Sequence, residues 1–514
     1  MDRRSFLKLA GVGAVAMASG PLRGATTADA PRPDVLLIMP DQMRGDCLSL
    51  LGHPVVRTPH LDNLARAGAC FTRAYTTAPS CIPARHSLLT GLFPPTSGVV
   101  GFRSRPIRWP TLPQRLAEAG YSTILVGRNM HQVPADNPYG YQRQVLGSTY
   151  VSDDDYDKFL KEAAPACGGI RQVIASLKID CNGWRAAPWP LADDLHPMAW
   201  IARQARKVVA EAEAGRPLFL TASFYAPHPP LFPPKKYFDA MLSRDLPAPA
   251  RGDWVNRAKL SPRGDAAGHR VLLEGDTLRR AQAGYFGLVE HIDDQIGPLV
   301  EEFQARSRKA GRPWFIVVTA DHGELLGDNG YFRKCEPYEG SARVPFIMAG
   351  EVGLGLQAGL QCDSPVCLED IMPTLLALAG APCPSPMDGI DLGPALRGQT
   401  RRVRDVLHFE HASCYSKEQA FQALTDGRYK YIWRTVSGDE QLFDLKKDPR
   451  EEHDLARDPS QAALVETWRA RMVRQLAGRP EGFSDGQKLI PGRPYPALQA
   501  VPAEAAEGRR PKSA

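Results

Sequence analysis

Apolar runs that alternate with segments of helical period constrain the fold of this chain more than any other feature of its sequence. The runs predict buried strands, and the segments between them predict amphipathic helices. Strands that alternate with helices favour a mostly parallel sheet covered by helices on both faces. We therefore predict an α/β fold with strands at residues 35–39, 122–126, 218–224, 314–319 and 345–349 and helices at 61–67, 112–119, 196–214, 277–306 and 368–379.

The pattern changes after about residue 404. Short apolar runs are separated by turn residues, and a helical pattern follows over about 460–476. This order indicates a smaller antiparallel sheet with a packed helix. We predict a large α/β domain over residues 31–404, a small α+β subdomain over 405–490 and an irregular tail over 491–514.

The first residues combine two adjacent arginines, Arg3 and Arg4, with a short apolar run. This pattern resembles a twin-arginine export signal, and the run is shorter than the about 20 residues that span a membrane. We predict a signal peptide over residues 1–30 and export of the folded protein by the twin-arginine translocation machinery to the periplasm or the medium. A membrane anchor is the alternative, but we expect no stable one. The ten cysteines form no Cys-x-x-Cys pairs, which argues against an obligatory disulfide framework.

The composition excludes few classes of partner. The net charge of +6 on 514 residues is mild, and no block of Lys and Arg indicates nucleic-acid binding. Such a charge is compatible with small anionic substrates without demonstrating them.

The segment PSCIPARHSLLTG, from Pro79 to Gly91, places one thiol at the start of a predicted helix. Pro83 suits the first helical position, and Gly91 can end the helix. Cys81 then lies where free N–H groups favour an anion, and Arg85 projects from the same face. Most single cysteines are buried small hydrophobes. Here a nucleophile beside an anion pocket is the simplest functional interpretation.

Acidic residues follow two of the predicted strands. Asp41 comes after the strand at 35–39, and Asp321 and His322 come after the strand at 314–319. Ligands of open α/β sheets bind at the carboxyl ends of strands, so these side chains converge if the strands are neighbours. Two carboxylates and one imidazole favour Ca²⁺, Mg²⁺ or Mn²⁺. The alternative interpretation of the segment at Asp321 and His322 is a surface turn.

Two motifs resemble signatures of the sulfatase family in the alkaline-phosphatase superfamily. They are Cys-x-Pro-x-Arg followed by Ser-Leu-Leu-Thr-Gly, and Asp-His-Gly-Glu-x-x-Gly-Asp-x-Gly-x-x-x-Lys, which ends at Lys334. The resemblance implies a sulfuric ester hydrolase in which a formylglycine-generating enzyme oxidises Cys81 to formylglycine. It also implies one divalent cation, Ca²⁺ in the first place and Mn²⁺ or Mg²⁺ otherwise. The implied ligands are Asp41, Gln42, Cys81, Asp321 and His322.

The sequence departs from the family pattern at two places. Many sulfatases have a second aspartate where this chain has Gln42. The Asp-Gln version resembles choline sulfatases and phosphonate monoester hydrolases. The chain also resembles iduronate-sulfatase-like members of the family. Gly127 to His131 resembles Gly-Lys-x-His, but Arg128 replaces the lysine and one residue is inserted before His131. The identity of the metal and the preferred reaction therefore stay open.

The resemblance also assigns roles to the remaining polar residues. His228, which lies between prolines after the strand at 218–224, binds the sulfate group and protonates the leaving alcohol. Lys334 and Arg85 hold the sulfate oxygens, and Arg128 contributes to substrate binding. His131 is the base that reopens the covalent adduct formed by the hydrated formylglycine.

We therefore predict a metal-dependent sulfatase that acts on a small or carbohydrate sulfate ester. A phosphonate monoester or phosphodiester hydrolase with the same nucleophile is the alternative. A relative that binds anions or glycans without catalysis is a second alternative, although the retained motifs argue against it. The sequence names neither the sulfated alcohol nor the oligomeric state.

The chemical state of residue 81 tests this interpretation directly. In protein from a host with a formylglycine-generating enzyme, we expect the peptide that contains residue 81 to have the mass of an aldehyde instead of a thiol. Protein from a host without that enzyme is the control and should keep the thiol. A thiol in both preparations, measured by peptide mass spectrometry, would contradict the assigned nucleophile.

Overall fold

A computed structural model of the chain describes residues 31–129, 131–149, 151–260 and 270–500. From Arg32 onward the chain belongs to one unit, built on an eight-stranded sheet with the order β5-β4-β6-β1-β7-β8-β2-β9. The strands are β1 (Asp34–Asp41), β2 (Ala69–Phe71), β4 (Ser122–Gly127), β5 (Arg143–Leu146), β6 (Leu218–Pro227), β7 (Trp314–Thr319), β8 (Phe346–Gly350) and β9 (Leu360–Cys362). The predicted signal peptide lies outside the described residues.

The centre of the sheet is parallel. β4, β6, β1 and β7 are parallel neighbours, and every residue of β1, β6 and β7 is buried. Strands buried on both faces are apolar along most of their length, which explains why the sequence alone locates them. β8 runs antiparallel to both β7 and β2. The predicted α/β fold with a mostly parallel sheet is confirmed.

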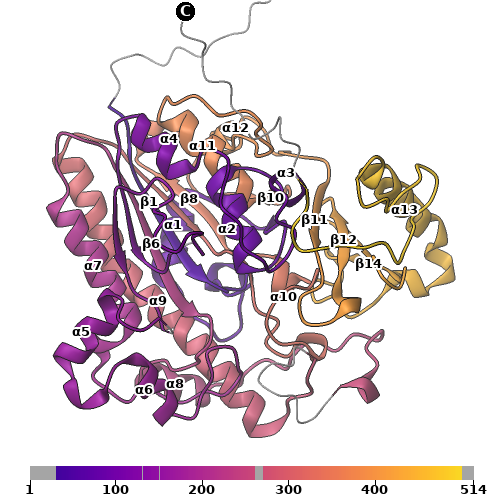
Figure 1. Cartoon of the computed structure of the whole chain (residues 1–514), viewed down its shortest axis with the longest axis horizontal. Coiled ribbons are helices and arrows are strands. Elements are labelled where there is room, and N and C mark those ends of the chain that lie inside the picture. The colour runs from indigo at the N-terminus through magenta and orange to yellow at the C-terminus, as the bar shows by residue number, and fades with distance from the viewer. Residues whose placement is uncertain (1–30, 130, 150, 261–269, 501–514) are drawn as a thin grey trace, which may run out of the picture. The chain divides into compact units, whose positions relative to one another are not determined.

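Helices cover the sheet on both sides (Figure 1). α9 (Gly275–Lys309) contacts both α1 (Pro59–Ala67) and α7 (Pro197–Glu211), and all three helices contact strands of the sheet. α2 (Cys81–Thr90), α4 (Leu112–Glu118) and α11 (Ile371–Leu378) form a second group that packs together. The described chain also contains α3 (Pro94–Ser97), α5 (Asp155–Ala163), α6 (Ile170–Ser176), α8 (Lys235–Leu242), α10 (Glu339–Ala342), α12 (Gly393–Leu396) and the paired strands β3 (Ala74–Tyr75) and β10 (Val366–Cys367).

The long helix α9 supports α1 through a buried carboxylate. Asp293 accepts hydrogen bonds from the backbone N–H of His60 at 3.1 Å and of Leu61 at 2.9 Å. These N–H groups lie in the first turn of α1, where they lack partners within the helix. None of the helices in the described part of the chain combines the length and apolar character that a membrane crossing requires.

A second, antiparallel sheet follows in the C-terminal part of the chain. It consists of β11 (Leu407–His411), β12 (Phe421–Thr425), β13 (Tyr429–Arg434) and β14 (Glu440–Asp444), and α13 (Ala462–Leu476) packs against it (Figure 1). Another cluster of side chains joins this sheet to the segment around Leu325 and Tyr338. The predicted small sheet and helix are confirmed, and the domain boundaries stay predictions.

Two local predictions are wrong. α2 begins at Cys81, so Pro83 is its third residue instead of its first. Proline is tolerated there because the first four N–H groups of a helix have no intrahelical partner. The Gly, Pro and Asp clusters between residues 134 and 189 predict loops, but this segment contains α5 and α6. The Asp154 side chain caps α5 by accepting from the N–H of Asp157. Gly91 ends α2 with φ 69°, as predicted.

The predicted irregular tail is described up to residue 500. Leu498 forms an isolated bridge with Val99, and the N–H of Val100 donates to the carbonyl of Ala497 at 3.1 Å. This part of the tail therefore lies along the chain that follows α3. Residues 501–514 are outside the described residues.

Trp468 provides a test of how α13 is held. Its side chain is buried between the helix and the small sheet, so Trp468→Ala should lower the free energy of unfolding by about 3–5 kcal/mol. Glu466→Ala, at an exposed position of the same helix, should change it by less than about 0.5 kcal/mol. Similar losses in both variants, measured by denaturant titration, would contradict this packing.

Candidate active site

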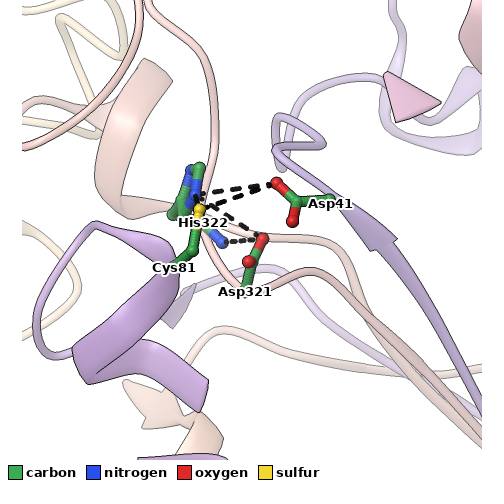
Figure 2. Close-up of side chains that lie close together, drawn as sticks. All are labelled: Asp41, Cys81, Asp321 and His322. Carbon is green, nitrogen blue, oxygen red and sulfur yellow. Dashed lines mark hydrogen bonds and ion pairs between the residues drawn. The ribbon is translucent and has the colours of Figure 1, made fainter. Parts of the chain in front are cut away.

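Cys81 lies at the carboxyl ends of the central strands, where several distant segments meet. Its side chain is buried, and its Sγ lies 3.0 Å from Lys334 Nζ and 3.1 Å from His322 Nε2. Asp41 Oδ1 is 3.9 Å from the sulfur. Figure 2 shows Asp41 at the end of its strand, facing Cys81, Asp321 and His322. The structure thus brings together the segments that sequence analysis singled out.

One guanidinium joins the two carboxylates of the site. Arg85 Nε donates to Asp321 Oδ2 at 2.8 Å, and Arg85 Nη2 donates to Asp41 Oδ2 at 2.6 Å. All three side chains are fully buried. Because buried charges need ionic partners, this pairing holds α2 over the ends of β1 and β7. Arg85 is one helical turn after Cys81, so the same contact places the thiol.

The surroundings of Cys81 stabilise a negative charge at its position. Burial raises the pKa of the thiol, but Lys334 and His322 outweigh it and lower the pKa to about 5. Burial and Asp41 also oppose the ionisation of Asp321, whereas His322 and Arg85 keep its pKa below the usual value. The site is therefore arranged to hold an anion at residue 81.

Asp41, Cys81, Asp321 and His322 also form a donor set for a metal ion. Each offers one ligand atom, and these atoms all lie within 4.8 Å of one another. His322 Nδ1–H donates to the carbonyl of Gly323 at 2.9 Å, which leaves Nε2 as the ring atom that faces the cluster. The carboxylates and the imidazole fit a hard divalent cation.

Gln42 lies beside this donor set. Its Oε1 accepts a hydrogen bond from Lys334 Nζ at 2.9 Å, and its Nε2 donates to Glu324. The amide oxygen thus contacts the ammonium group that also contacts Cys81. A metal contact of Gln42 stays a prediction.

His228 and Arg128 are held next to Asp41. The backbone N–H of His228 donates to the carbonyl of Asp41 at 3.1 Å, and Arg128 Nη1 lies 2.7 Å from Asp41 Oδ2. His228 Nδ1–H donates to the carbonyl of Pro229 at 2.7 Å. Burial, Lys334 and Arg128 hold the pKa of His228 well below its usual value. The ring is therefore neutral in the free protein, with the lone pair on Nε2.

His131 is connected to the site through Arg128. Arg128 Nη2 donates to His131 Nε2 at 2.9 Å, and burial, Arg128 and Arg85 hold the pKa of His131 well below its usual value. The ring centroid of Phe102, a partly exposed side chain, lies 6.4 Å from that of His131. The predicted action of His131 on residue 81 stays a prediction.

Three residues without a predicted role support the site. Glu324 accepts from the Gln42 amide, and the Tyr285 hydroxyl donates to the Gln42 carbonyl at 2.7 Å. The Ser80 hydroxyl lies 2.7 Å from His411 Nε2, at the end of β11. Glu324 belongs to the motif that begins at Asp321, so the sequence could have identified it as a candidate site residue. Tyr285 and His411 carry no motif and come from distant parts of the chain.

Comparisons with known proteins agree with this arrangement. The family model described as Sulfatase matches residues 33–381, and the model described as N-sulphoglucosamine sulphohydrolase, C-terminal, matches residues 327–477. An arylsulfatase of Clostridium perfringens is 35% identical over 491 residues, which are 91% of this chain and 100% of that protein. A choline-sulfatase of Rhizobium meliloti is 28% identical over 456 residues, which are 83% of each chain.

A solved structure is also similar over most of its length. The phosphonate monoester hydrolase from Silicibacter pomeroyi superposes with a TM-score of 0.72 and 26% sequence identity. The match covers 87% of this chain and 95% of that one. Most of this fold therefore has a counterpart in a solved structure.

The donor set predicts that divalent cations stabilise the fold. For a chelator-treated sample, Ca²⁺, Mn²⁺ or Mg²⁺ at about 100 times its Kd should add about 2.7 kcal/mol to the free energy of unfolding. Asp321→Asn should abolish this gain, because a neutral amide replaces a carboxylate ligand. Thermal unfolding with and without each ion measures the effect.

A second group of potential ligands provides the control. His60, Asp293 and Asp294 also lie close together, and Asp294 is exposed. Asp294→Asn should keep the gain in stability. A gain that persists in Asp321→Asn and disappears in Asp294→Asn would place the ion elsewhere.

Proposed function

Because the chain belongs to the sulfatase family, we propose that it hydrolyses a sulfate ester to an alcohol and inorganic sulfate, with residue 81 as the nucleophile. The observation that carries the proposal is the position of Cys81. It is buried, 3.0 Å from the Lys334 ammonium, in one cluster with two carboxylates and an imidazole. A nucleophile that attacks an anionic ester must lie close to positively charged groups that hold the ester, and Cys81 lies in such a position.

Two groups would add chemistry that the unmodified side chains lack. As formylglycine, made by a formylglycine-generating enzyme, residue 81 would carry an aldehyde, and addition of water to that aldehyde would supply a hydroxyl nucleophile. A divalent cation, Ca²⁺ in the first place and Mn²⁺ or Mg²⁺ otherwise, held by Asp41, Gln42, residue 81, Asp321 and His322, would supply positive charge to the sulfate oxygens.

The cationic side chains bind and orient the ester. The Lys334 ammonium group donates one hydrogen bond to Gln42 and one to Cys81. An ammonium group has three N–H donors. The third is free to turn toward a sulfate oxygen. Arg128, which directly follows β4 and contacts Asp41, adds positive charge beside the same carboxylate. Arg85 keeps the two carboxylates together and so preserves the geometry around residue 81.

His228 is the proposed proton donor to the leaving alcohol. It is neutral in the free protein because of burial, Lys334 and Arg128. A bound sulfate ester brings a negative charge that offsets these cations, so the pKa of the imidazole rises when substrate binds. Nε2 can then carry the proton. The neutral His131, joined to the site by Arg128, is the proposed base in the step that expels sulfate.

A phosphonate monoester or phosphodiester hydrolase with the same nucleophile is the second candidate. Gln42 favours it, because many sulfatases have a second aspartate at this place. The superposition on a phosphonate monoester hydrolase also supports it. The retained Cys81, Arg85 and Lys334 argue against a non-catalytic relative: Lys334 contacts the thiol, and Arg85 holds the two carboxylates beside it.

We further propose that the protein acts in the periplasm or the medium. The proposal rests on the sequence of residues 1–30, which resembles a twin-arginine signal. Because such a protein folds in the cytoplasm, oxidation of residue 81 and loading of the metal could be complete before export. The substrate would be a small or carbohydrate sulfate ester.

Cys81→Ala tests the nucleophile. We expect hydrolysis of an aryl sulfate to fall to the background rate, because alanine offers no group for oxidation or attack. Cys70→Ala is the matched control, since Cys70 is equally buried but lies in β2. It should keep turnover, and near-UV circular dichroism should show both variants folded. Unchanged turnover in Cys81→Ala would refute the assignment.

The wild-type protein separates the two candidate reactions. Values of kcat/KM are compared for an aryl sulfate and an aryl phosphonate in the same buffer and with the same metal. We expect the sulfate to be the better substrate. A preference for the phosphonate would establish the second candidate instead.

A further inference from the structure

The Gln42 amide has charged partners on both sides, and they select one of its two orientations. Its nitrogen donates to Glu324 Oε2, and its oxygen accepts from Lys334 Nζ at 2.9 Å. A carboxylate only accepts hydrogen bonds and an ammonium group only donates them. The flipped amide would set oxygen against carboxylate and N–H against ammonium. The observed orientation is therefore the one that both partners favour.

The backbone of Gln42 is fixed as well. Its N–H donates to Asp321 Oδ1 at 3.0 Å, and its carbonyl accepts from the Tyr285 hydroxyl at 2.7 Å. Its φ of 66° lies in the left-handed region, which few side chains adopt without such support. Because the backbone of Gln42 is fixed, only the orientation of its side-chain amide can still change.

Glu324 cannot turn to accommodate a different amide. Its Oε1 accepts from the backbone N–H of Leu326 at 2.8 Å and also from that of Arg333. The residue is 2% exposed, so water does not compete for these bonds. With Oε1 used by two backbone donors, Oε2 is the oxygen that faces Gln42. The backbone therefore determines which group Gln42 meets.

Lys334 connects this arrangement to the nucleophile. Its ammonium group contacts both Gln42 Oε1 and Cys81 Sγ, at 2.9 and 3.0 Å. Lys334 is 3% exposed and follows Arg333, whose N–H binds Glu324. An ammonium group on a flexible stem takes its position from its acceptors. The amide oxygen of Gln42 thus sets where the ammonium lies beside residue 81.

We propose that Glu324 is a positioning residue of the active site: it holds the Gln42 amide with its oxygen toward Lys334, and so places the ammonium group beside residue 81. Glu324 acts through Gln42 and need not touch the substrate. Its effect on turnover rests on the proposed function, whereas its effect on binding of inorganic sulfate does not.

Glu324→Gln is the decisive variant because two backbone N–H groups determine the orientation of the new side-chain amide. The new side chain must keep its oxygen toward the N–H groups of Leu326 and Arg333, which leaves its nitrogen toward Gln42. Gln42 then turns its oxygen to this nitrogen and its N–H₂ to Lys334. We expect the Kd of inorganic sulfate, measured by calorimetry on the metal-loaded protein, to rise at least about ten-fold.

The sign of this change separates positioning from simple electrostatics. Glu324→Gln removes a negative charge near the proposed anion site, which by itself would tighten sulfate binding. Weaker binding follows only if the hydrogen-bond pattern matters more than the charge. Glu369→Gln is the matched control, because Glu369 is equally buried but contacts Thr77 instead of Gln42. We expect it to bind sulfate as the wild type does.

Exchange of the two side chains should restore the pattern. In the double variant Gln42→Glu with Glu324→Gln, the new amide at 324 donates to one oxygen of Glu at 42, and the other oxygen accepts from Lys334. The total charge of the pair is unchanged. Gln42→Glu alone places two carboxylates in contact and should unfold at a lower temperature. We expect the double variant to regain sulfate binding to within about three-fold of wild type.

The outcomes decide the proposal in every case. Unchanged or tighter sulfate binding in a folded Glu324→Gln overturns it. If Glu324→Gln does not fold, the double variant decides, because the proposal requires it to fold and to bind sulfate better than Gln42→Glu. Failure of the exchange overturns the proposal as well. A wild type that binds sulfate but turns over no sulfate ester refutes the proposed function and leaves Glu324 to be judged by binding.

Discussion

Two buried carboxylates at the ends of neighbouring strands determine how the rest of the site is built. Asp41 and Asp321 lie at the carboxyl ends of β1 and β7, which pair in the parallel part of the sheet. Two ionised groups without access to water cost several kcal/mol each unless cations pair with them. Arg85 pairs with both. The position of α2, and therefore of Cys81 in its first turn, follows from this requirement.

The C-terminal part of the chain completes the same site from the other side. Ser80 contacts His411 at the end of β11, and the N–H of Cys335 donates to the carbonyl of Pro79 at 2.8 Å. Side chains of the small sheet pack against the segment that carries Lys334. Loss of this sheet would therefore disturb both residue 81 and its ammonium partner, even though the acidic residues lie in the large sheet.

Sequence reasoning could locate what depends on local pattern. The apolar runs place β1, β4, β6, β7 and β8, and Gly91 marks the end of α2. The acidic residues were recognisable because each follows a strand, and strand ends of a parallel sheet share one edge. The direction of β8, the partners of Gln42 and the contact of His411 depend on long-range packing. No local pattern encodes these features, so they appear only in three dimensions.

The charges around residue 81 narrow the choice of reaction without completing it. Arg85, Arg128 and Lys334 face two carboxylates, and Gln42 adds no charge where a second aspartate would. A sulfate ester and a phosphonate monoester each carry one negative charge, so the field of the site treats them alike. A phosphate monoester carries up to two and would be distinguished. Selection between sulfate and phosphonate must therefore come from the groups that contact the oxygens, among which the orientation of Gln42 and Lys334 is the variable that this chain controls.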